Sequence, residues 1–544
     1  MSELSKVSLM RVERIPLSQI PHVTPLYSDY LSAHAKVSRY YPVPPLKRGW
    51  LAEQANARAK DYPLERRQRV ADVLDAQNKD WGASRKTLDN ITRLRDGDQA
   101  VVTGQQVGLF GGPLFAILKA ITAVKVAEEA TTAGVRAVPI FWLATEDHDV
   151  AEVSFANIPA KTHLQKVTIL PDAIEGLPVS AVKLDDEIAV AARTASQLLG
   201  DSEVSQWIGE FYRPGTTLGD AYARLFARLF AKQGVILLDA SSPELHEIAK
   251  PVYLKAAAQA TEITDALLQR DQELEASGYH AQVKVTRTST LLFASQDSVR
   301  TPVQRSNSHF AIGKEKFSAE DLAARVAARP QDFSANALLR PVVQDFLLPT
   351  LAYIGGPAEV AYFAQSAVVY EKLMGRITPI LPRISATLLE PHIQRKLTRH
   401  QLLLPMVFQG EEILARTLAT HGLPPELTAK FAGAKETLNT TLGSLEASLE
   451  KLDPTLKAAA ERSGKKMKYQ LSRLQQRAAL AEQRRNADLI RHAHELTSAL
   501  YPHKNLQERE VAGVYFIARY GMQLIDSLKD STQSACPDHQ VVYL

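Results

Sequence analysis

The first part of the chain alternates short apolar runs with segments whose apolar residues recur at helical spacing. An apolar run at 100–103 follows an Asp-Gly-Asp turn, and a second run covers 135–143. Between them, over 114–130, apolar residues recur every three or four positions. Short apolar runs bounded by turn residues are typical of buried strands, and the three-four spacing is typical of a helix with a buried face. The pattern predicts a β-α-β unit.

The turn between the first strand and the helix is rich in glycine. Gly104, Gly108, Gly111 and Gly112 precede Pro113, which suits the first turn of a helix because its missing N–H loses nothing there. A strand, glycines and a helix in this order direct backbone N–H groups at one crevice, which favours a phosphate or a carboxylate. The turn lacks the Gly-Lys-Ser/Thr of a P-loop, so a tight connection without a ligand is the alternative.

Three further strands are predicted, at 234–239, 351–354 and 377–383. Strands that alternate with helical segments predict an α/β fold with a parallel, Rossmann-type sheet. We expect residues 1–390 to form this core, with insertions at about 155–230 and 281–330.

From residue 391 the pattern changes to that of a coiled coil. Leucines between 438 and 452 alternate at spacings of four and three, and the same spacing resumes from Met467. Asp453-Pro454 and Ser463-Gly464 interrupt the pattern, which predicts a long antiparallel helical hairpin within 391–510, with Lys465, Lys466 and Lys468 near its tip. Such a seam often pairs with a second copy, so we expect a homodimer. Residues 511–544 are expected to pack back on the core.

Composition narrows the class of protein. A chain of 544 residues with 45% apolar and 23% charged residues is ordinary for a globular protein of two to four domains. A net charge of +4 gives no reason to expect nucleic acid. The single cysteine, Cys536, excludes an internal disulfide framework and a cysteine metal cluster, and it fits a reducing cytoplasm. No window reaches the ~18 apolar residues that a membrane span requires.

An acidic cluster follows the second strand of the β-α-β unit. Glu146, Asp147, His148 and Asp149 place three carboxylates and an imidazole just past a strand end. Such a cluster suits Mg²⁺, an amine or a ribose, and it can move protons. A solvated acidic turn that caps a helix is the alternative, and it needs no ion.

Polar residues elsewhere are predicted to face the same crevice, because carboxyl ends of parallel strands meet at one edge of the sheet. They are Thr103, Gln105, Gln106, Lys119 and Asp239 from the first half, and Tyr353, Gly355, Gly356, Glu359, Tyr362, Gln365 and Arg383 from the second. Among these, Lys119 and Arg383 are the obvious phosphate partners. Packing of a Gly-Gly turn against a helix is the alternative for 353–365.

Four segments carry a resemblance to a known family. They are TGQQVGLFGGP at 103–113, FWLATEDHD at 141–149, GGPAE at 355–359 and LQER at 506–509. Together they resemble the BshC family, the cysteine-adding enzymes of bacillithiol synthesis, over nearly the whole chain. The resemblance implies a core similar to class I aminoacyl-tRNA synthetases, with two inserted connecting segments and a dimerising coiled coil. It also implies an adenine nucleotide, ATP or ADP, bound away from the sheet crevice, with Asn505, Gln507 and Arg509 as its contacts.

The activity that the resemblance implies is addition of L-cysteine to glucosaminyl-malate through an amide bond. Because a free carboxylate does not acylate an amine in water, the cysteine carboxyl must be activated, most simply by ATP. The turn amides of 104–112 would then stabilise phosphate charge, the carboxylates of 146–149 would hold an ammonium group or Mg²⁺, and His148 would take the amine proton. The synthetase signatures, a His pair on the first helix and a Lys-rich loop after the last strand, are missing. A nucleotide-binding dimeric scaffold that needs a partner for catalysis is therefore the alternative, and a transfer-RNA-binding synthetase relative is disfavoured by the low net charge.

Overall fold

The computed structural model describes residues 9–169, 176–296, 299–306, 309–485 and 487–544. The chain divides into two compact units. The first comprises Met1–Ala160, Gln165–Leu388 and Glu508–Leu544, and the second comprises Lys161–Leu164 and Leu389–Gln507. No helix in the described part of the chain is long and apolar enough to cross a membrane.

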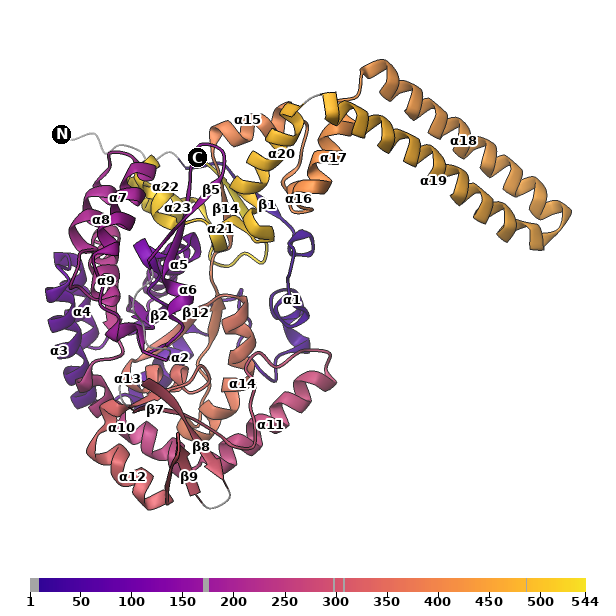
Figure 1. Ribbon diagram of the computed structural model, residues 1–544. Coiled ribbons are helices and arrows are strands. Elements are labelled where there is room, and N and C mark those ends of the chain that lie inside the picture. Colours follow the sequence, from indigo (N-terminus) through magenta and orange to yellow (C-terminus); the bar gives the residue numbers. More distant parts are fainter. Residues whose placement is uncertain (1–8, 170–175, 297–298, 307–308, 486) are drawn as a thin grey trace. The chain divides into compact units, whose positions relative to one another are not determined.

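A five-stranded parallel sheet lies at the centre of the first unit (Figure 1). Its strand order is β13-β12-β2-β3-β6, and all four neighbouring pairs are parallel. The strands are β2 (Gln99–Gln105), β3 (Ala137–Leu143), β6 (Ile236–Asp239), β12 (Thr350–Gly355) and β13 (Ile380–Pro382). The predicted Rossmann-type parallel sheet is confirmed, and β2, the first predicted strand, is its middle strand.

Apolar residues cover both faces of this sheet, which explains why its strands read as unbroken apolar runs. Val101 packs in a cluster with Ala123, Val126 and Ala127 of α5 (Leu114–Thr132). Its neighbour Val102 points the other way, into the main core with residues of α3 (Leu64–Asp80) and α4 (Arg85–Arg95). The predicted β-α-β unit is therefore β2-α5-β3.

The first unit contains further helices besides α3, α4 and α5. They are α1 (Pro25–Ser32), α2 (Leu51–Asp61), α6 (Val150–Val153), α7 (Glu187–Leu199), α8 (Glu203–Phe211), α9 (Leu218–Leu229), α10 (Pro243–Ala258), α11 (Ala260–Ala276), α12 (Ala319–Ala328), α13 (Arg340–Leu347), α14 (Pro357–Met374), α22 (Gly513–Tyr520) and α23 (Gln523–Ser531). The Ser318–Asp321 pair at the start of α12 forms the capping box that its sequence indicates.

Smaller sheets lie beside the central one. An antiparallel sheet has the order β10-β9-β8-β7-β11, with β7 (Ser289–Gln296), β8 (Val299–Ser306), β9 (His309–Ile312), β10 (Glu315–Phe317) and β11 (Phe333–Ala335). β4 (Phe155–Pro159) pairs with β5 (Leu164–Thr168). The third sheet has the order β1-β15-β14, from β1 (Val12–Ile15), β15 (His539–Tyr543) and β14 (Ala386–Leu389). It joins both ends of the chain to the segment that follows β13.

The second unit is helical. Its helices are α15 (Pro391–Arg399), α16 (Leu404–Val407), α17 (Glu411–His421), α18 (Pro425–Leu452), α19 (Pro454–Arg485) and α20 (Ala487–Leu500). α18 and α19 lie side by side as an antiparallel hairpin (Figure 1), about 48 Å long along α19 at about 1.5 Å per residue.

The tip of this hairpin differs from the prediction. The turn is at Asp453, and α19 begins at Pro454, so Ser463-Gly464 does not interrupt the helix. A Cβ at Gly464 would lie 3.2 Å from a methyl group of Leu442, which shows that the small residue lets the two helices approach. Lys465, Lys466 and Lys468 therefore lie on the body of α19 rather than in a turn.

Candidate active site

A cavity of about 280 Å³ opens at the carboxyl ends of β2, β3 and β12, within the first unit. Its lining includes four basic residues and three acidic ones. They are Lys119, Arg340, Arg383, Arg509, Asp147, Glu152 and Glu359, joined by Gly104, Gln105, Gln106, Phe115, Trp142, Ala144, Gln344, Tyr353, Gly356, Pro357, Ala358 and Tyr362. We call it the central pocket. The parallel sheet thus brings together the residues predicted from its two halves, because the ends of adjacent parallel strands share one edge.

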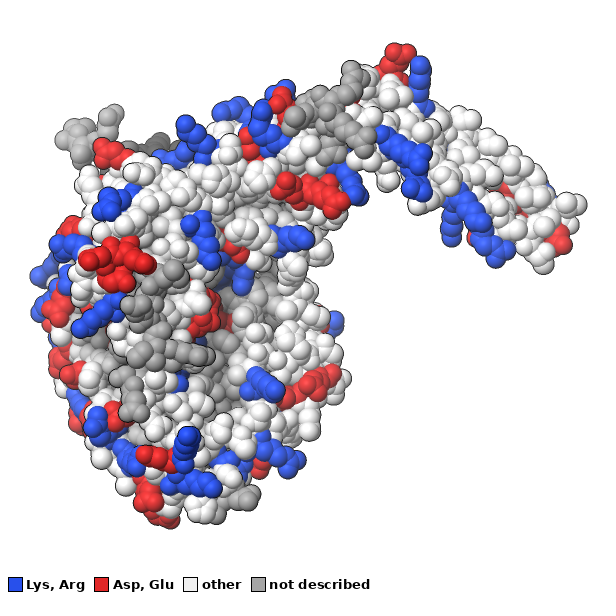
Figure 2. Space-filling model, in the orientation of Figure 1, with Lys and Arg blue, Asp and Glu red and all other residues white. Residues whose placement is uncertain are grey.

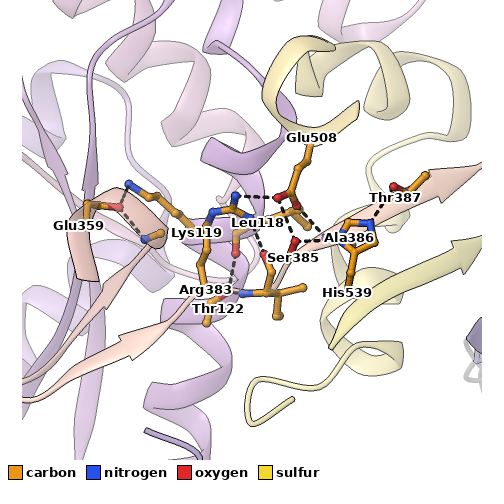
Figure 3. A network of polar contacts seen from close by, with 12 residues as sticks. Leu118, Lys119, Thr122, Glu359, Arg383, Ser385, Ala386, Thr387, Glu508 and His539 are labelled. Atoms are coloured by element: carbon orange, nitrogen blue, oxygen red, sulfur yellow. Dashed lines mark hydrogen bonds and ion pairs between the residues drawn. The ribbon is translucent and has the colours of Figure 1, made fainter. Parts of the chain in front are cut away.

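Lys119 and Glu359 form a buried ion pair at the floor of the pocket (Figure 3). Lys119 Nζ lies 2.6 Å from Glu359 Oε2, and it also donates to the carbonyl of Gly104 at 2.7 Å and to Gln105 Oε1 at 2.9 Å. An ammonium has three N–H donors, so all of them are engaged. Burial lowers the pKa of Lys119, and Glu359 opposes that shift. Lys119 therefore holds strand ends and helix α14 together rather than standing ready for a phosphate.

Arg383 and Glu508 form a second buried pair (Figure 3). Arg383 Nη2 donates to Glu508 Oε1 at 2.7 Å, and Glu508 Oε2 accepts the backbone N–H of Ala386 at 2.7 Å. Burial alone would raise the pKa of Glu508, yet its pKa lies below the usual range because Arg383 pairs with it. The pocket wall at Arg383 is consequently fixed by the C-terminal segment.

Asp147 pairs with Arg340, a third basic residue of the pocket. Its Oδ2 accepts from Arg340 Nη1 at 2.9 Å, and its Oδ1 accepts from Arg300 Nη1 at 3.4 Å. Burial would lower the pKa of Arg340, but the Asp147 carboxylate raises it well above its ordinary value. Asp147 is thus paired with two arginines, which fits a role in placing Arg340 better than a role in proton transfer.

Two ionisable groups of the pocket, Arg509 and Glu152, form no ion pair within the described part of the chain, although Glu152 has a hydrogen bond with Gln106 and an electrostatic interaction with Arg509. The exposed Arg509 side chain has no hydrogen bond or ion pair with any residue that the structure describes, and its guanidinium lies 5.9 Å from the centre of the Phe115 ring. Burial and the nearby Asp149 raise the pKa of Glu152, whereas the hydrogen bond with Gln106 and the charge of Arg509 oppose this shift. Arg509 can meet an anion, and Glu152 can exchange a proton.

In the glycine turn, for which the sequence predicts an anion site, three glycine amides already have partners. The N–H of Gly108 donates to Gln106 O, that of Gly111 to Gly108 O and that of Gly112 to Leu109 O. The N–H of Leu114, the first residue of α5, donates to Val511 O at 2.8 Å. These amides are therefore used within the turn and by the C-terminal segment. The glycines serve close packing, since a Cβ at Gly108 would lie 3.0 Å from Cα of Gly112.

The acidic cluster is divided among different environments. Asp147 lines the pocket, whereas Asp149 caps the short helix α6 by accepting from the N–H of Glu152. His148 Nδ1 lies 3.3 Å from Arg300 Nη1, outside the pocket lining. Glu146 Oε1 lies 3.2 Å from His246 Nε2, although the contact lacks the geometry of a hydrogen bond. The helix-capping alternative is thus the one that describes Asp149.

Several other predicted residues have structural contacts. Thr103 is buried and donates to Ile354 O at 2.9 Å, joining β2 to β12. Gln365 is buried and exchanges hydrogen bonds with the backbone of Val283, away from the pocket. Asp239 accepts from Thr145 and Ser241, and burial raises its pKa.

The remaining predicted positions are Gly355 and the nucleotide contacts. A Cβ at Gly355 would lie 2.7 Å from Ile380, so this glycine serves packing. Of the predicted nucleotide contacts, Arg509 lines the pocket, while Asn505 and Gln507 belong to the second unit, where Gln507 Nε2 donates to Ala499 O at 2.9 Å.

No group of three histidine, cysteine or carboxylate side chains suited to a metal ion is found among the described residues. A Mg²⁺ ion commonly binds through one or two carboxylates together with phosphate oxygens. The donor set here does not make a metal cage of its own.

Two family models match the chain end to end. Residues 10–384 match the model described as "Bacillithiol biosynthesis BshC, N-terminal Rossmann-like domain", and residues 386–544 match "Bacillithiol biosynthesis BshC, C-terminal coiled-coil domain". The chain belongs to the BshC family. The resemblance seen in the sequence is confirmed, and so is the combination of a Rossmann-like domain with a coiled-coil domain.

Similar proteins cover nearly the full length. Proteins named "Putative cysteine ligase BshC" are 48% identical in Koribacter versatilis, 37% in Solibacter usitatus and 31% in Salinibacter ruber. These alignments cover 97%, 96% and 97% of this chain and 99%, 98% and 98% of the relatives. The family is thus one of ligase enzymes. A solved structure described as a putative arginyl tRNA synthetase from Campylobacter jejuni is 9% identical to this chain. The match covers 84% of this chain and 97% of the solved chain, with a TM-score of 0.21, which is too low to support a conclusion about the fold.

Sequence reasoning missed several residues of this BshC-family site, including four that line the pocket: Phe115, Trp142, Glu152 and Arg340. Arg340 and Glu152 carry no motif, because Arg340 lies on α13 and Glu152 lies three residues beyond the end of the acidic cluster at Asp149. Phe115 and Trp142 read as core positions of a helix and a strand. Glu508, which pairs with the pocket residue Arg383, stands inside the LQER segment between Gln507 and Arg509, so the resemblance did contain its signal.

Proposed function

We propose that this BshC-family chain is a ligase that joins the carboxyl group of L-cysteine to the amine of glucosaminyl-malate, completing bacillithiol. The names of the full-length relatives support the cysteine ligase activity, and the family supports the pathway. One structural observation carries the proposal: the central pocket presents Arg340, Arg383 and Arg509 beside Asp147, Glu152 and Glu359. Substrates that carry both carboxylates and an ammonium group need both signs of charge in one cavity.

The cations of the pocket suit the anionic groups of these substrates. Arg340 and Arg383 are each paired with a carboxylate, Asp147 and Glu508 respectively, so their guanidinium groups keep one orientation before a ligand arrives. A guanidinium matches a carboxylate or a phosphate through two parallel hydrogen bonds. In this proposal they orient the substrates, and no reorganisation is needed when charge develops during acyl transfer.

The step that needs energy is activation of the cysteine carboxyl. We propose ATP as its source, forming an adenylate or an acyl phosphate that the sugar amine then attacks. Arg509 and Arg383 have the charge to hold phosphate oxygens, whereas the amides of Gly108, Gly111 and Gly112 are already used within the turn. A Mg²⁺ ion would bind mainly through the phosphates.

The attacking amine must lose a proton, and we assign that proton to Glu152. This side chain lines the pocket and has a raised pKa, so it accepts a proton near neutral pH more readily than an ordinary glutamate. His148 and Asp147 are less suited, because both are engaged with Arg300.

Two further parts of the proposal concern the whole protein. The coiled-coil domain leaves Leu445, Met467 and Leu474 about half exposed. A second copy that covers these apolar side chains would make the homodimer expected from the seam. A cytoplasmic site of action fits the single thiol and a product that is itself a thiol reductant.

A nucleotide-binding scaffold that requires a partner is the second candidate. The observation that favours it is that Lys119 and the amides of Gly108, Gly111 and Gly112 already have partners, which removes phosphate contacts expected of a synthetase-like centre. Turnover by the purified chain alone distinguishes the two, because a scaffold forms no product without its partner.

A further inference from the structure

The C-terminal segment contributes two adjacent residues with opposite roles at the central pocket. Both lie on the short helix α21 (Gln507–Glu510). Glu508 is 1% exposed and points into the protein, whereas Arg509 is exposed and lines the pocket. A segment more than a hundred residues away in sequence from Arg383 therefore completes the pocket wall.

Every contact of the Glu508 carboxylate fixes the chain around β13. Oε1 accepts from Arg383 Nη2 at 2.7 Å and from Ser385 Oγ at 3.0 Å, and Oε2 accepts from the N–H of Ala386 at 2.7 Å (Figure 3). Ser385 Oγ in turn lies 2.8 Å from Nδ1 of the buried His539 on β15. The three hydrogen bonds, together with the contact between Ser385 and His539, hold the Glu508 carboxylate in one position.

Arg383 keeps donors available after this pairing. Its Nη2 donates to Glu508 and its Nη1 to Ile384 O at 2.8 Å, which uses two of the five N–H groups of a guanidinium. Its guanidinium carbon lies 5.4 Å from the centre of the Phe115 ring, and that of Arg509 lies 5.9 Å from the same centre. Both guanidinium groups thus lie within about 6 Å of the centre of one aromatic ring of the pocket.

We propose that Glu508 is a positioning residue that sets Arg383, together with Arg509, as a two-guanidinium site for one anionic group of a substrate. The inference rests on the proposed function for the choice of substrate. The chemistry recognised is a carboxylate or a phosphate, which glucosaminyl-malate and ATP respectively supply. Glu508 does not touch the ligand; it acts through Arg383.

The same unit contains a matched pair that lies outside the pocket. Arg58 and Asp345 are as deeply buried as Arg383 and Glu508, with their charged atoms 3.8 Å apart, and neither lines the pocket. Asp345→Asn removes the charge of one buried carboxylate and keeps its size, as Glu508→Gln does. A purely structural role for Glu508 predicts that the two variants behave alike.

The experiment measures binding by isothermal titration calorimetry with the full-length chain. Glucosaminyl-malate and ATP are titrated separately into the wild type, Glu508→Gln, Asp345→Asn and Arg509→Met, and thermal unfolding is recorded for each. We expect Glu508→Gln to weaken one of the two ligands at least tenfold, Arg509→Met to weaken the same ligand without a loss of melting temperature, and Asp345→Asn to bind within twofold of the wild type. The ligand that is weakened identifies the anionic group as carboxylate or phosphate.

Equal affinities of Glu508→Gln and Asp345→Asn for both ligands would overturn the inference, and so would a wild type that binds neither ligand. If Glu508→Gln does not fold, Ser385→Ala and Arg509→Met remain: unchanged affinity in both would overturn it. Turnover is assayed separately. If the variants differ in binding but the wild type forms no product, the ligase proposal is refuted and the anion site stands. If the wild type forms product but the variants bind as it does, the anion site is refuted and the ligase proposal stands.

Discussion

Nζ of Lys119 lies 2.6 Å from Oε2 of Glu359, and the lysine side chain is 3% exposed. The pair joins the first helix of the β-α-β unit to the start of α14, and thereby the two halves of the sheet at the pocket floor. Removing one partner of a buried pair leaves a charge without compensation, which typically costs about 3–5 kcal/mol.

Glu359→Gln is therefore expected to lower the free energy of unfolding by about 3 kcal/mol at pH 7, measured by urea denaturation. The glutamine side chain can still accept the hydrogen bond from the N–H of Gly356. The loss of stability therefore reports the missing negative charge and not the loss of the helix cap. Lys119→Met combined with Glu359→Gln should recover part of the loss. A single variant that loses less than about 1 kcal/mol would show that the pair is not needed at the pocket floor.

Glu152→Gln tests the proton acceptor. As a base, Glu152 must be ionised, so the wild-type rate should rise with pH through a pKa above that of an ordinary glutamate. The variant should lose this limb of the pH profile and about 10²–10⁴ in rate. Asp147→Asn is the control, because it removes a carboxylate that is already paired with two arginines. If the limb survives in Glu152→Gln but disappears in Asp147→Asn, the assignment is wrong.

His539 makes stability depend on pH. Burial lowers its pKa from 6.5 to about 4, so between these values the unfolded chain binds a proton that the folded chain does not. The free energy of unfolding should therefore fall by about 3 kcal/mol from this group as the pH drops from 6.5 to 4. Above pH 6.5 the imidazole is neutral in both states and this loss is absent. His539→Gln should flatten the difference in unfolding free energy between pH 4.5 and 7. Identical slopes in variant and wild type would contradict a buried neutral imidazole.

Gly104 is predicted to be required for the approach of β2 and β3. A Cβ there would lie 3.0 Å from both Cβ and the carbonyl oxygen of Trp142. Gly104→Ala should cost about 1–3 kcal/mol by overpacking. Gly209→Ala, in helix α8 with open space around it, should be neutral or slightly stabilising. Equal melting temperatures for the two variants would show that β3 can move to accept the added methyl group without a loss of stability.

Much of the fold follows from the sequence, because the parallel sheet is made of apolar runs and its connections begin with Gly and Pro. Val101 and Val102 pack on opposite faces, which is why the run does not alternate. The hairpin was predictable as well, but not its turn, since Gly464 reads as a break and is in fact a small residue where α19 packs on Leu442.

The site was predictable only in part. Strand ends pointed to Lys119, Glu359 and Arg383, because adjacent parallel strands deliver their following residues to one edge. Local sequence does not show which amides are already used, so the turn at 108–112 looked like an anion cradle. Arg340 in the pocket pairs with Asp147, and Glu508 outside the lining pairs with Arg383; both are tertiary contacts that local spacing does not predict.

Figure 2 shows basic and acidic side chains interspersed over the face in view, without an extended patch of one sign. This distribution agrees with a net charge of +4 and offers no broad basic surface on that face for a polyanion. The concentrated charge described above lies in the central pocket.

The most direct test is turnover by the purified chain with L-cysteine, glucosaminyl-malate and MgATP, followed by mass spectrometry of the thiol product and of the nucleotide. The account predicts bacillithiol together with AMP for an adenylate, or with ADP for an acyl phosphate. Absence of product with every substrate present, while nucleotide remains bound and unchanged, would contradict the ligase and favour a scaffold that needs a partner.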